Sequence, residues 1–384
     1  MTELSSPKTP TWILTLAVAI IGSNSFVLSP ILAQVAADMD TQPVAVARAI
    51  SAFGAATAVS SLVYARRGGG GSVRRVLTLC ALIMTASLVG SAFSRAWYQL
   101  AFCQAVIGAT VGQMLPTIYA AATANAPEGQ GGAILGKILR GWGIALVLGV
   151  PFSAFVSDLA GWRAVYLVIA AAAAIATVGF AKLLPKETLD AAGGAGPGLS
   201  GAFAASGARP LLLICLLYMT AFYGLYPYIG LRLHETFGAS ASEAGIVVLV
   251  YGAGFGSASY AMGIIDRAGP RRVFAPILMA IAAIYLVLIP ATATMPGALA
   301  GAFAWGIVNH IGVNLIILLL SRRGEASRSA LMGLHTTTTY VAIFLGPAVL
   351  GALYTASGFA SAGMTAAVFV ALAAAVAWGK RTLW

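Results

Sequence analysis

The sequence predicts an all-α membrane protein with twelve transmembrane helices in two parallel six-helix repeats, and three observations carry that prediction. Of the 384 residues, 60% are apolar and only 9% are charged, and the mean hydropathy is +0.91. A soluble domain has about a quarter of its residues charged, so water cannot surround most of this chain. Apolar runs of about 20 residues, the length that spans a bilayer as a helix, recur from end to end. The third observation is an internal repeat.

The apolar runs between charged and Gly/Pro-rich breaks define the expected helices. In the first half of the chain they cover 12–35, 44–65, 74–94, 97–124, 132–157 and 163–184. In the second half they cover 210–231, 242–264, 273–292, 297–320, 330–354 and 361–379. The opening segment MTELSSPKTP lacks the charged start and the cleavage site of a signal peptide. The first apolar run is therefore expected to be the first spanning helix.

One long polar and Gly-rich connection divides the chain into halves. It predicts an N-terminal six-helix bundle over 1–184, a cytoplasmic linker over 185–209 and a C-terminal six-helix bundle over 210–384. A single shift of 197 residues aligns the two halves. The matched pairs are Arg74 with Arg271, Arg75 with Arg272, Pro30 with Pro227, Asp38 with Glu235, Gly149 with Gly346, and Gly161 with Gly358. An even number of helices per half makes such repeats parallel, and in transporters these halves rock about a site near the membrane midplane.

The net charge of +11 is an orientation signal. With the N-terminus inside, sixteen Lys and Arg residues face the cytoplasm and four face the outside, which is the positive-inside bias. Both termini are thus expected on the cytoplasmic side of a cell inner (plasma) membrane, and nucleic acid is excluded as a partner. The three scattered cysteines give no support for metal or disulfide chemistry, and hydrolase, zinc-protease and complete nucleotide-binding motifs are missing. No cofactor and no enzymatic activity are expected.

The stretch RRGGGGSVRR, Arg66–Arg75, allows three interpretations: a phosphate-binding loop, an inserted flexible linker, or a degenerate gating loop. A phosphate loop needs a preceding strand and a following Lys-Ser/Thr, and both are missing. The 197-residue shift places the stretch on GIIDRAGPRRV, Gly263–Val273. That second copy resembles the conserved cytoplasmic loop of the major facilitator superfamily, of the form G-x-x-x-D-R-x-G-R-R. The inserted-linker alternative stays open.

The resemblance implies that an acid and several basic residues in this loop gate the cytoplasmic side. The residues carried over are Asp266, Arg267, Arg271 and Arg272 in the second half, and Arg74 and Arg75 in the first. The first copy has glycine where the acid should be. It is therefore interpreted as the degenerate one.

The stretch GIALVLGVPFSAFVSDLAGWR, Gly143–Arg163, resembles the helix-five signature of the superfamily's twelve-helix drug, sugar and metabolite efflux branch, which contains drug:H⁺ antiporters. Gly143, Gly149 and Pro151 are expected to allow close helix approach and a bend. The first helix, FVLSPILAQVAADMD, also fits this branch. One position departs from it, because Gln104 stands in helix four where these exporters usually carry an arginine.

Polar residues at membrane depth are costly and are therefore candidate site residues. Arg140 has two interpretations: a snorkelling cation, or a cavity cation that meets an anionic or carbonyl-rich substrate. His310 and Asn314 lie one helical turn apart and share a face. The candidate substrate-binding set is Arg140, His310, Asn314, His335, Tyr340, Asn24, Gln113, Tyr218 and Tyr223.

The resemblance implies a secondary active transporter that exports a small organic molecule by alternating access, as a monomer within the lipid bilayer. Acidic residues avoid the middle of every expected span, so histidine is the candidate carrier of a coupling proton. One alternative is a facilitator or exchanger of an organic anion that uses Arg140. A second, from another class, is a lipid scramblase or membrane enzyme.

Overall fold

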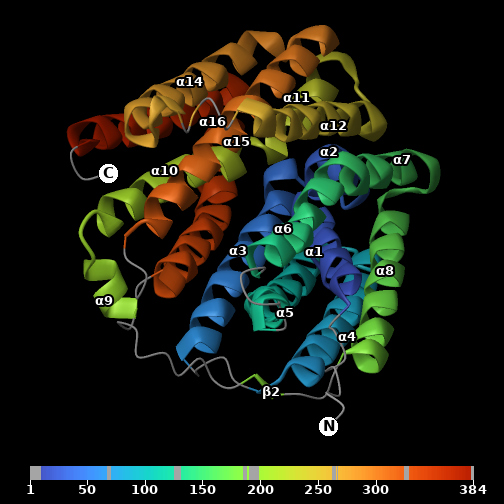
Figure 1. Ribbon diagram of the computed structural model, residues 1–384. Helices are drawn as coiled ribbons and strands as arrows, with labels where there is room; N and C mark the ends of the chain where they lie inside the picture. Colours follow the sequence, from blue (N-terminus) through green and yellow to red (C-terminus); the bar gives the residue numbers. More distant parts are fainter. Residues whose placement is uncertain are drawn as a thin grey trace.

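The computed structural model describes residues 10–66, 71–124, 131–184, 188–189, 199–261, 265, 267–323 and 328–381. Long helices make up nearly all of this part of the chain (Figure 1). Ten of the described helices are long and apolar enough to cross a membrane, or eleven if one bent pair counts as a single span. The chain is therefore a multi-pass membrane protein.

The first half runs through eight helical segments and one π-helix. They are α1 (Thr11–Phe26), α2 (Leu28–Asp38), α3 (Pro43–Arg66), α4 (Val73–Ala92), α5 (Trp97–Ala124), α6 (Gly131–Ile144), the π-helix η1 (Ala145–Gly149), α7 (Val150–Ala160) and α8 (Trp162–Leu183). The second half begins with a short helix in the linker. Its segments are α9 (Leu199–Ala204), α10 (Ala208–Leu225), α11 (Pro227–Phe237), α12 (Ala241–Ser257), the 3-10 helix η2 (Ala258–Ala261), α14 (Pro270–Ala291), α15 (Met295–Ser321) and α16 (Arg328–Gly379).

Proline accounts for three breaks in spans that the sequence predicts as single runs. A proline lacks the N–H that would bond the carbonyl four residues earlier, and its ring clashes with that carbonyl. Pro30 accounts for the 50° bend between α1 and α2, and Pro227 opens α11 directly after α10. Pro151 follows η1, where the helix widens to the π form that commonly interrupts α-helices at functional sites.

Glycine accounts for the sharp ends of two further helices. Gly161 has φ 82° and ψ 159° between α7 and α8, and Gly358 has φ 77° and ψ −177° inside α16. This conformation is open almost only to glycine. The two spans expected at 330–354 and 361–379 thus form one element, α16, that is broken at Gly358.

The helix bounds follow the shift found in the sequence. The first residues of α4 and α14, Val73 and Pro270, are 197 positions apart, as are the last residues of α5 and α15, Ala124 and Ser321. Gly161 and Gly358 have the same separation.

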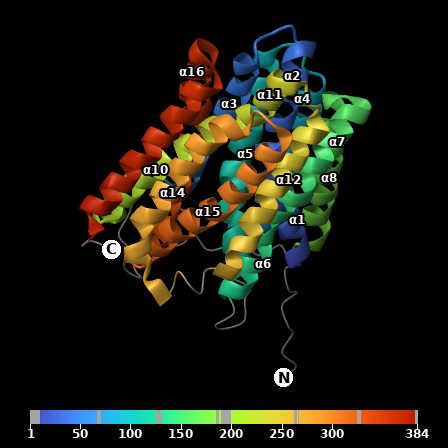
Figure 2. The same ribbon diagram turned by 90° about the horizontal axis from the view of Figure 1, so that it is seen from above.

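Helices of the first half pack directly against helices of the second half. The α3 helix packs against α16, α12 packs against α7 and η1, and α11 packs against α2. Figure 2 shows α11 beside α2 and α12 beside α7. One small sheet departs from the all-helical expectation: β1 (Gly71–Ser72) pairs antiparallel with β2 (Thr188–Leu189) in the linker.

Candidate functional site

The two halves are joined by a carboxylate at one end of their interface, which is called the Asp158 end below. Asp158 on α7 accepts hydrogen bonds from the backbone N–H groups of Ala241 and Ser242 in the first turn of α12, at 3.2 and 2.7 Å. Gln34 on α2 donates a third bond to the same carboxylate at 2.7 Å. A helix N-terminus carries unpaired N–H groups and partial positive charge. The carboxylate therefore caps a helix of the other half.

Backbones also approach closely toward this end. The Ser29 hydroxyl donates to the carbonyl oxygen of Tyr226 at 2.8 Å, and the two residues are 197 positions apart. A Cβ on Gly230 would lie 2.6 Å from the Ser29 carbonyl oxygen, and one on Gly245 would lie 2.6 Å from Cβ of Ala154. Such glycines let helices of the two halves pack backbone to backbone.

At the opposite end of the interface, called the linker end below, the helices α6 and α12 of the two halves are apart. On α12 a Cβ at Gly252 would still meet Val147 at 3.0 Å. One turn nearer the linker, Gly256 on α12 and Gly143 on α6 have nothing within 4 Å of a Cβ. The close helix approach expected at Gly143 is therefore absent here, because α6 and α12 have diverged. Gly149 does meet another helix, since its Cβ would contact the Ser23 hydroxyl of α1.

Aromatic rings fill the space between the closed and the open end. Phe26 of α1 stacks on Tyr223 of α10 with ring centroids 6.1 Å apart, and meets the edge of Tyr226 at 5.3 Å. Trp142 of α6 reaches Phe26 from the first half at 6.3 Å. The remaining members of this central aromatic cluster are Phe222, Tyr251, Phe255, Tyr285 and Trp305.

Asn309 of α15 is buried beside this cluster. The Tyr218 hydroxyl donates to its side-chain and backbone oxygens, the latter at 3.1 Å, and its amide donates to the Tyr251 hydroxyl at 2.5 Å. Sequence reasoning selected Tyr218 but missed Asn309 and most of the rings. The available signal was spacing: Trp305 and Asn309, like Tyr251 and Phe255, stand four residues apart and so share a helix face.

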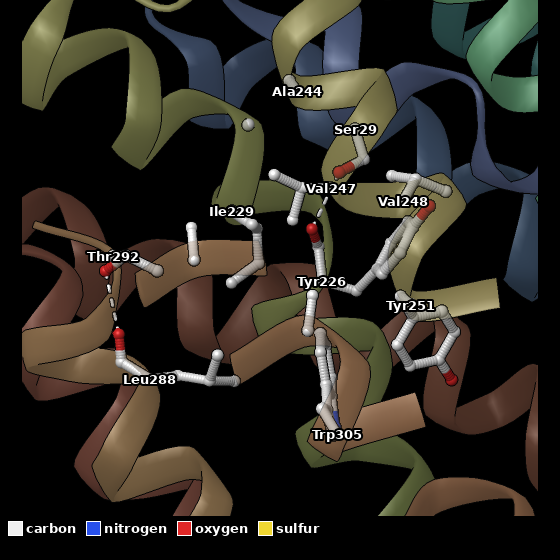
Figure 3. Close-up of a pocket in the computed structure, with 13 residues that line it drawn as sticks. Ser29, Tyr226, Ile229, Ala244, Val247, Val248, Tyr251, Leu288, Thr292 and Trp305 are labelled. Carbon is white, nitrogen blue, oxygen red and sulfur yellow. Dashed lines mark hydrogen bonds between the residues drawn. The ribbon is translucent and has the colours of Figure 1, made fainter. Parts of the chain in front are cut away.

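Figure 3 shows the cavity beside this cluster, with Tyr226, Tyr251 and Trp305 in its wall. Its volume is about 20 Å³, enough for one water molecule. Leu288 and Thr292 lie on its far side, and the Thr292 hydroxyl bonds back to the Leu288 carbonyl at 2.9 Å. The wall is almost wholly apolar. In this conformation the cavity is too small to hold an organic substrate.

Two predicted site residues lie on α15. The His310 ring meets the Phe255 ring edge to face at 4.6 Å, so it joins the central aromatic cluster. Its Nδ1 is buried and, within the described residues, has no hydrogen-bond partner. Asn314 donates to the carbonyl of His310 at 2.8 Å, which uses one of its amide hydrogens within its own helix.

Two further predicted residues lie on α16. The Nε2 of His335 is buried and has no hydrogen-bond partner among the residues that the structure describes. Thr339 donates to the His335 backbone carbonyl at 3.0 Å, the back-bonding that threonines make in helices. Tyr340, one residue further, packs its ring against Phe53 of α3 at 6.2 Å and so joins the two halves.

The predicted polar residues of α1 and α5 form a pair. Asn24 and Gln104 are buried and exchange two hydrogen bonds, at 3.0 and 3.2 Å, between their amide groups. Gln104 stands where the resemblance leads one to expect an arginine, and its neutral amide both donates to and accepts from the neutral amide of Asn24. Gln113 instead donates to the Ala109 carbonyl of its own helix at 3.4 Å.

Arg140 is not brought together with these residues. It is exposed, and it lines a groove between α1 and α6 together with Lys137. Trp142, two residues on, points the other way, toward Phe26 and the Tyr119 hydroxyl. Two helical residues are about 200° apart around the axis. Arg140 therefore lies on the face of α6 away from the central aromatic cluster.

The predicted gating residues lie at the linker end, except that Asp266 falls outside the described residues. Arg74 and Arg75 lie in the first turn of α4, Arg271 and Arg272 lie in that of α14, and Arg267 precedes α14. Burial, and then the charge of Arg271, lower the pKa of the nearby Arg323 guanidinium.

The two loops that the repeat equates differ in backbone. Gly269 precedes α14 with φ 89°, which requires glycine, whereas Ser72 precedes α4 with φ −68°. Ser72 instead pairs with Thr188 of the linker, in β1 and β2.

Comparison with known proteins places this geometry in one family. The family model of the Major Facilitator Superfamily matches residues 14–322 and, overlapping them, 211–382. An uncharacterized MFS-type transporter of Bacillus subtilis (strain 168), YwfA, is 26% identical over 368 residues, which cover 94% of this chain and 89% of the relative. A chloramphenicol resistance protein of Streptomyces lividans is 26% identical over 270 residues, 69% of each chain.

Solved structures agree in fold. The occupied, inward-facing structure of a bacterial homolog of the human lysosomal transporter Spinster has a TM-score of 0.76 at 15% identity, covering 97% of this chain and 96% of the other. The human organic anion transporter MFSD10 has a TM-score of 0.65 at 16% identity, covering 98% and 100%. With a family match that spans the chain, a described fold made almost wholly of helices, and two halves closed at one end and open at the other, this chain belongs to the major facilitator superfamily of transporters.

Proposed function

We propose that the protein is a secondary active transporter that exports a small organic molecule by alternating access, with a proton as the coupling ion. The observation that carries this proposal is the asymmetry of the interface between the halves. The helices meet at the Asp158 end and diverge at the linker end, with the central aromatic cluster between. Alternating access requires such a pair of ends, of which one is open at a time.

The proposed architecture is twelve helices in two parallel repeats, 1–184 and 210–384, joined by the cytoplasmic linker 185–209. Joining α1 to α2, α6 to α7 and α10 to α11, and dividing α16 at Gly358, leaves twelve spans. The contact between Ser29 and Tyr226 supports a two-fold relation, because equivalent residues meet where they lie near the axis that relates them. The positive-inside bias supports a cytoplasmic linker end and cytoplasmic termini.

The proposed substrate site is the linker-end face of the central aromatic cluster. Tyr223 and Phe26 offer stacked ring faces, and His310 and His335 carry ring nitrogens without a hydrogen-bond partner in the described part of the chain. Rings with a few polar groups suit a neutral molecule that has an apolar or aromatic body. The similarity to a chloramphenicol resistance protein supports export of such a molecule.

Histidine is the proposed proton carrier. The acidic residues in the described part of the chain lie toward the Asp158 end, where Glu243 caps α12 and Glu235 accepts a bond from Tyr354. His310 contacts the Phe255 ring of the cluster, and imidazole is the side chain whose ordinary titration falls near neutral pH. The anion-exchange alternative is not favoured, because Arg140 lies on the opposite face of α6 from the cluster.

The test is pH-gradient-driven flux in proteoliposomes, with chloramphenicol and similar neutral aromatic compounds as probes. We expect His310→Gln to retain probe binding and to lose most of the dependence of flux on the pH gradient. His234→Gln is the matched control, because His234 lies at the Asp158 end and bonds the Ala239 carbonyl at 3.0 Å. Gradient-driven flux that is unchanged in His310→Gln would remove the histidine from the coupling mechanism. Flux without any response to a gradient in the wild type would make the protein a facilitator.

A further inference from the structure

A second hollow lies outside the central aromatic cluster, between the linker-end parts of α1 and α6. Its volume is about 440 Å³, far larger than the central cavity. It is called the α1/α6 groove below. Its lining residues are Thr11, Trp12, Thr15, Leu16, Ala19, Lys137, Arg140 and Ile144.

The groove carries two positive charges and no acid. Lys137 and Arg140 are three residues apart on α6 and share a face. Both are exposed, and neither forms an ion pair with any residue that the structure describes. All other lining side chains are neutral. The groove is therefore complementary to an anion.

The walls of the groove belong to the apolar outer surface of the protein. Trp12 is 56% exposed and Ile144 is 43% exposed, and Leu148, one turn beyond Ile144, is 62% exposed. Large apolar side chains with this exposure on a transmembrane helix contact lipid chains. Because Trp142 occupies the opposite face of α6, the groove faces the bilayer.

The polar and apolar lining residues are sorted along the helix axes. Thr11 and Lys137 lie nearest the linker end, and the Thr15 hydroxyl contacts the Lys137 carbonyl at 3.4 Å, which places these turns side by side. Arg140 lies one turn beyond Lys137, near the level of Ala19, because a Cβ on the adjacent Gly141 would meet the Ala19 backbone nitrogen at 2.9 Å. Ile144 follows one further turn into the bilayer. Trp12, in the first turn of α1, has the position of an interfacial aromatic residue. A phospholipid shows the same order, with a charged phosphate followed by hydrocarbon.

We propose that the α1/α6 groove binds one anionic phospholipid of the linker-side leaflet. Lys137 and Arg140 hold the phosphate, since Arg and Lys side chains bend toward the interface while their stems stay in apolar surroundings. Leu16, Ala19 and Ile144 contact an acyl chain. The site is separate from the proposed transport site, so the lipid is a resident of the fold rather than its cargo.

The test is native mass spectrometry of the detergent-purified protein titrated with phosphatidylglycerol, and separately with phosphatidylcholine of the same chain length. We expect the wild type to bind phosphatidylglycerol in preference, and the double variant Lys137→Gln/Arg140→Gln to bind it about 10-fold or more weakly. The matched control is Arg74→Gln/Arg75→Gln, which removes the same charge at the same end but outside the groove. It should weaken binding by less than about twofold.

Three outcomes would overturn the proposal. Equal loss in both double variants would mean that only the net charge of the linker end matters. Equal binding of the two lipids by the wild type would remove the selectivity for an anionic headgroup. Displacement of the lipid by millimolar inorganic phosphate would assign the site to a free anion, against the proposal. Because both cations are exposed, thermal unfolding in lipid-free detergent should be the same for all variants, which separates a lost site from a lost fold.

Discussion

The Asp158 end and the linker end of the interface use the same kind of residue in opposite ways. At the Asp158 end, Gly230 and Gly245 leave no room for a Cβ, because the opposite helix lies within 2.6 Å of where it would stand. At the linker end, Gly143 and Gly256 have open space around the same position. Small residues at both ends suit a molecule in which each end closes in turn. In this structure the Asp158 end is closed, and Gly143 and Gly256 at the linker end have no neighbour within 4 Å of a Cβ.

The largest effect is expected from bulky residues at these glycines. Gly230→Leu places a side chain against the Ser29 carbonyl and so opposes closure of the Asp158 end. Overpacking of this kind costs about 1–3 kcal/mol, which is a shift of about 5- to 150-fold in the closing equilibrium. Gly256→Leu meets open space here and obstructs the linker end instead. We expect both variants to lose most transport, with cysteine accessibility shifted in opposite directions. Gly230→Leu should expose the Asp158 end, and Gly256→Leu should keep the linker end exposed.

The comparison would break if the two leucine variants shifted accessibility in the same direction. A thermal unfolding temperature close to that of the wild type would show that each variant still folds. Gly136→Leu, at a further open position on α6, is a useful companion to Gly256→Leu.

A smaller effect is expected from Asp158→Ala. The variant removes the acceptor of three hydrogen bonds, two of which come from the first turn of α12 in the other half. Because the carboxylate is exposed to solvent, we expect a net loss of about 1 kcal/mol, which is about a fivefold shift toward an open Asp158 end. Distances between spin labels on α7 and α12 would measure it.

The control for that shift is Asp38→Asn. Asp38 pairs with Arg163 at 2.5 Å, and both residues belong to the first half, so closure of the interface should not respond. Equal shifts in both variants would mean that surface charge, rather than the cap on α12, sets the equilibrium.

The smallest effect is expected from Ser29→Ala, which removes one neutral hydrogen bond to the Tyr226 carbonyl. A bond of this kind contributes about 1 kcal/mol or less, so the label distances should move in the same direction as in Asp158→Ala but by less. Ser25→Ala removes a bond of similar length, 2.8 Å, to the carbonyl of Ile21 in the same helix. The same shift in both serine variants would argue against a role of the Ser29 bond in closure.

The sequence predicts the spans well and their breaks poorly. Hydropathy locates α5 at 97–124, as observed, because a bilayer-length apolar run leaves little choice of structure. The same signal passes through Pro30 and Pro227 without change, since proline is apolar enough to be counted within a run. The repeat shift of 197 residues survives in the structure as matched helix bounds, because it depends on residue order alone.

Which face of a helix a side chain occupies is harder to predict in a membrane protein. In a soluble protein the polar face of a helix marks the outside, whereas here both the lipid side and the protein side are apolar. The sequence therefore favours Arg140 as a central residue, whereas packing shows that Trp142, two residues on, is the one that reaches Phe26. The sequence does not single out Asn309, which stands beside His310, because its partners Tyr218 and Tyr251 lie on other helices and their proximity cannot be read from the chain order.

The π-helix η1 lies between two surfaces of one long helical run, and it sets the angle around the helix axis between them. On its linker side, α6 presents Lys137 and Arg140 to the α1/α6 groove; on its other side, α7 presents Asp158 to α12. Each residue of an α-helix turns the chain by about 100°, and a π segment holds one residue more than the α-helical turn it replaces. Deleting one residue within 145–149 should thus leave a continuous α-helix that keeps Arg140 and Asp158 on their present faces, whereas deleting one residue in the α-helical turns on either side would rotate the two ends by about 100° against each other. A single-residue deletion should therefore be tolerated better within η1 than in α6 or α7.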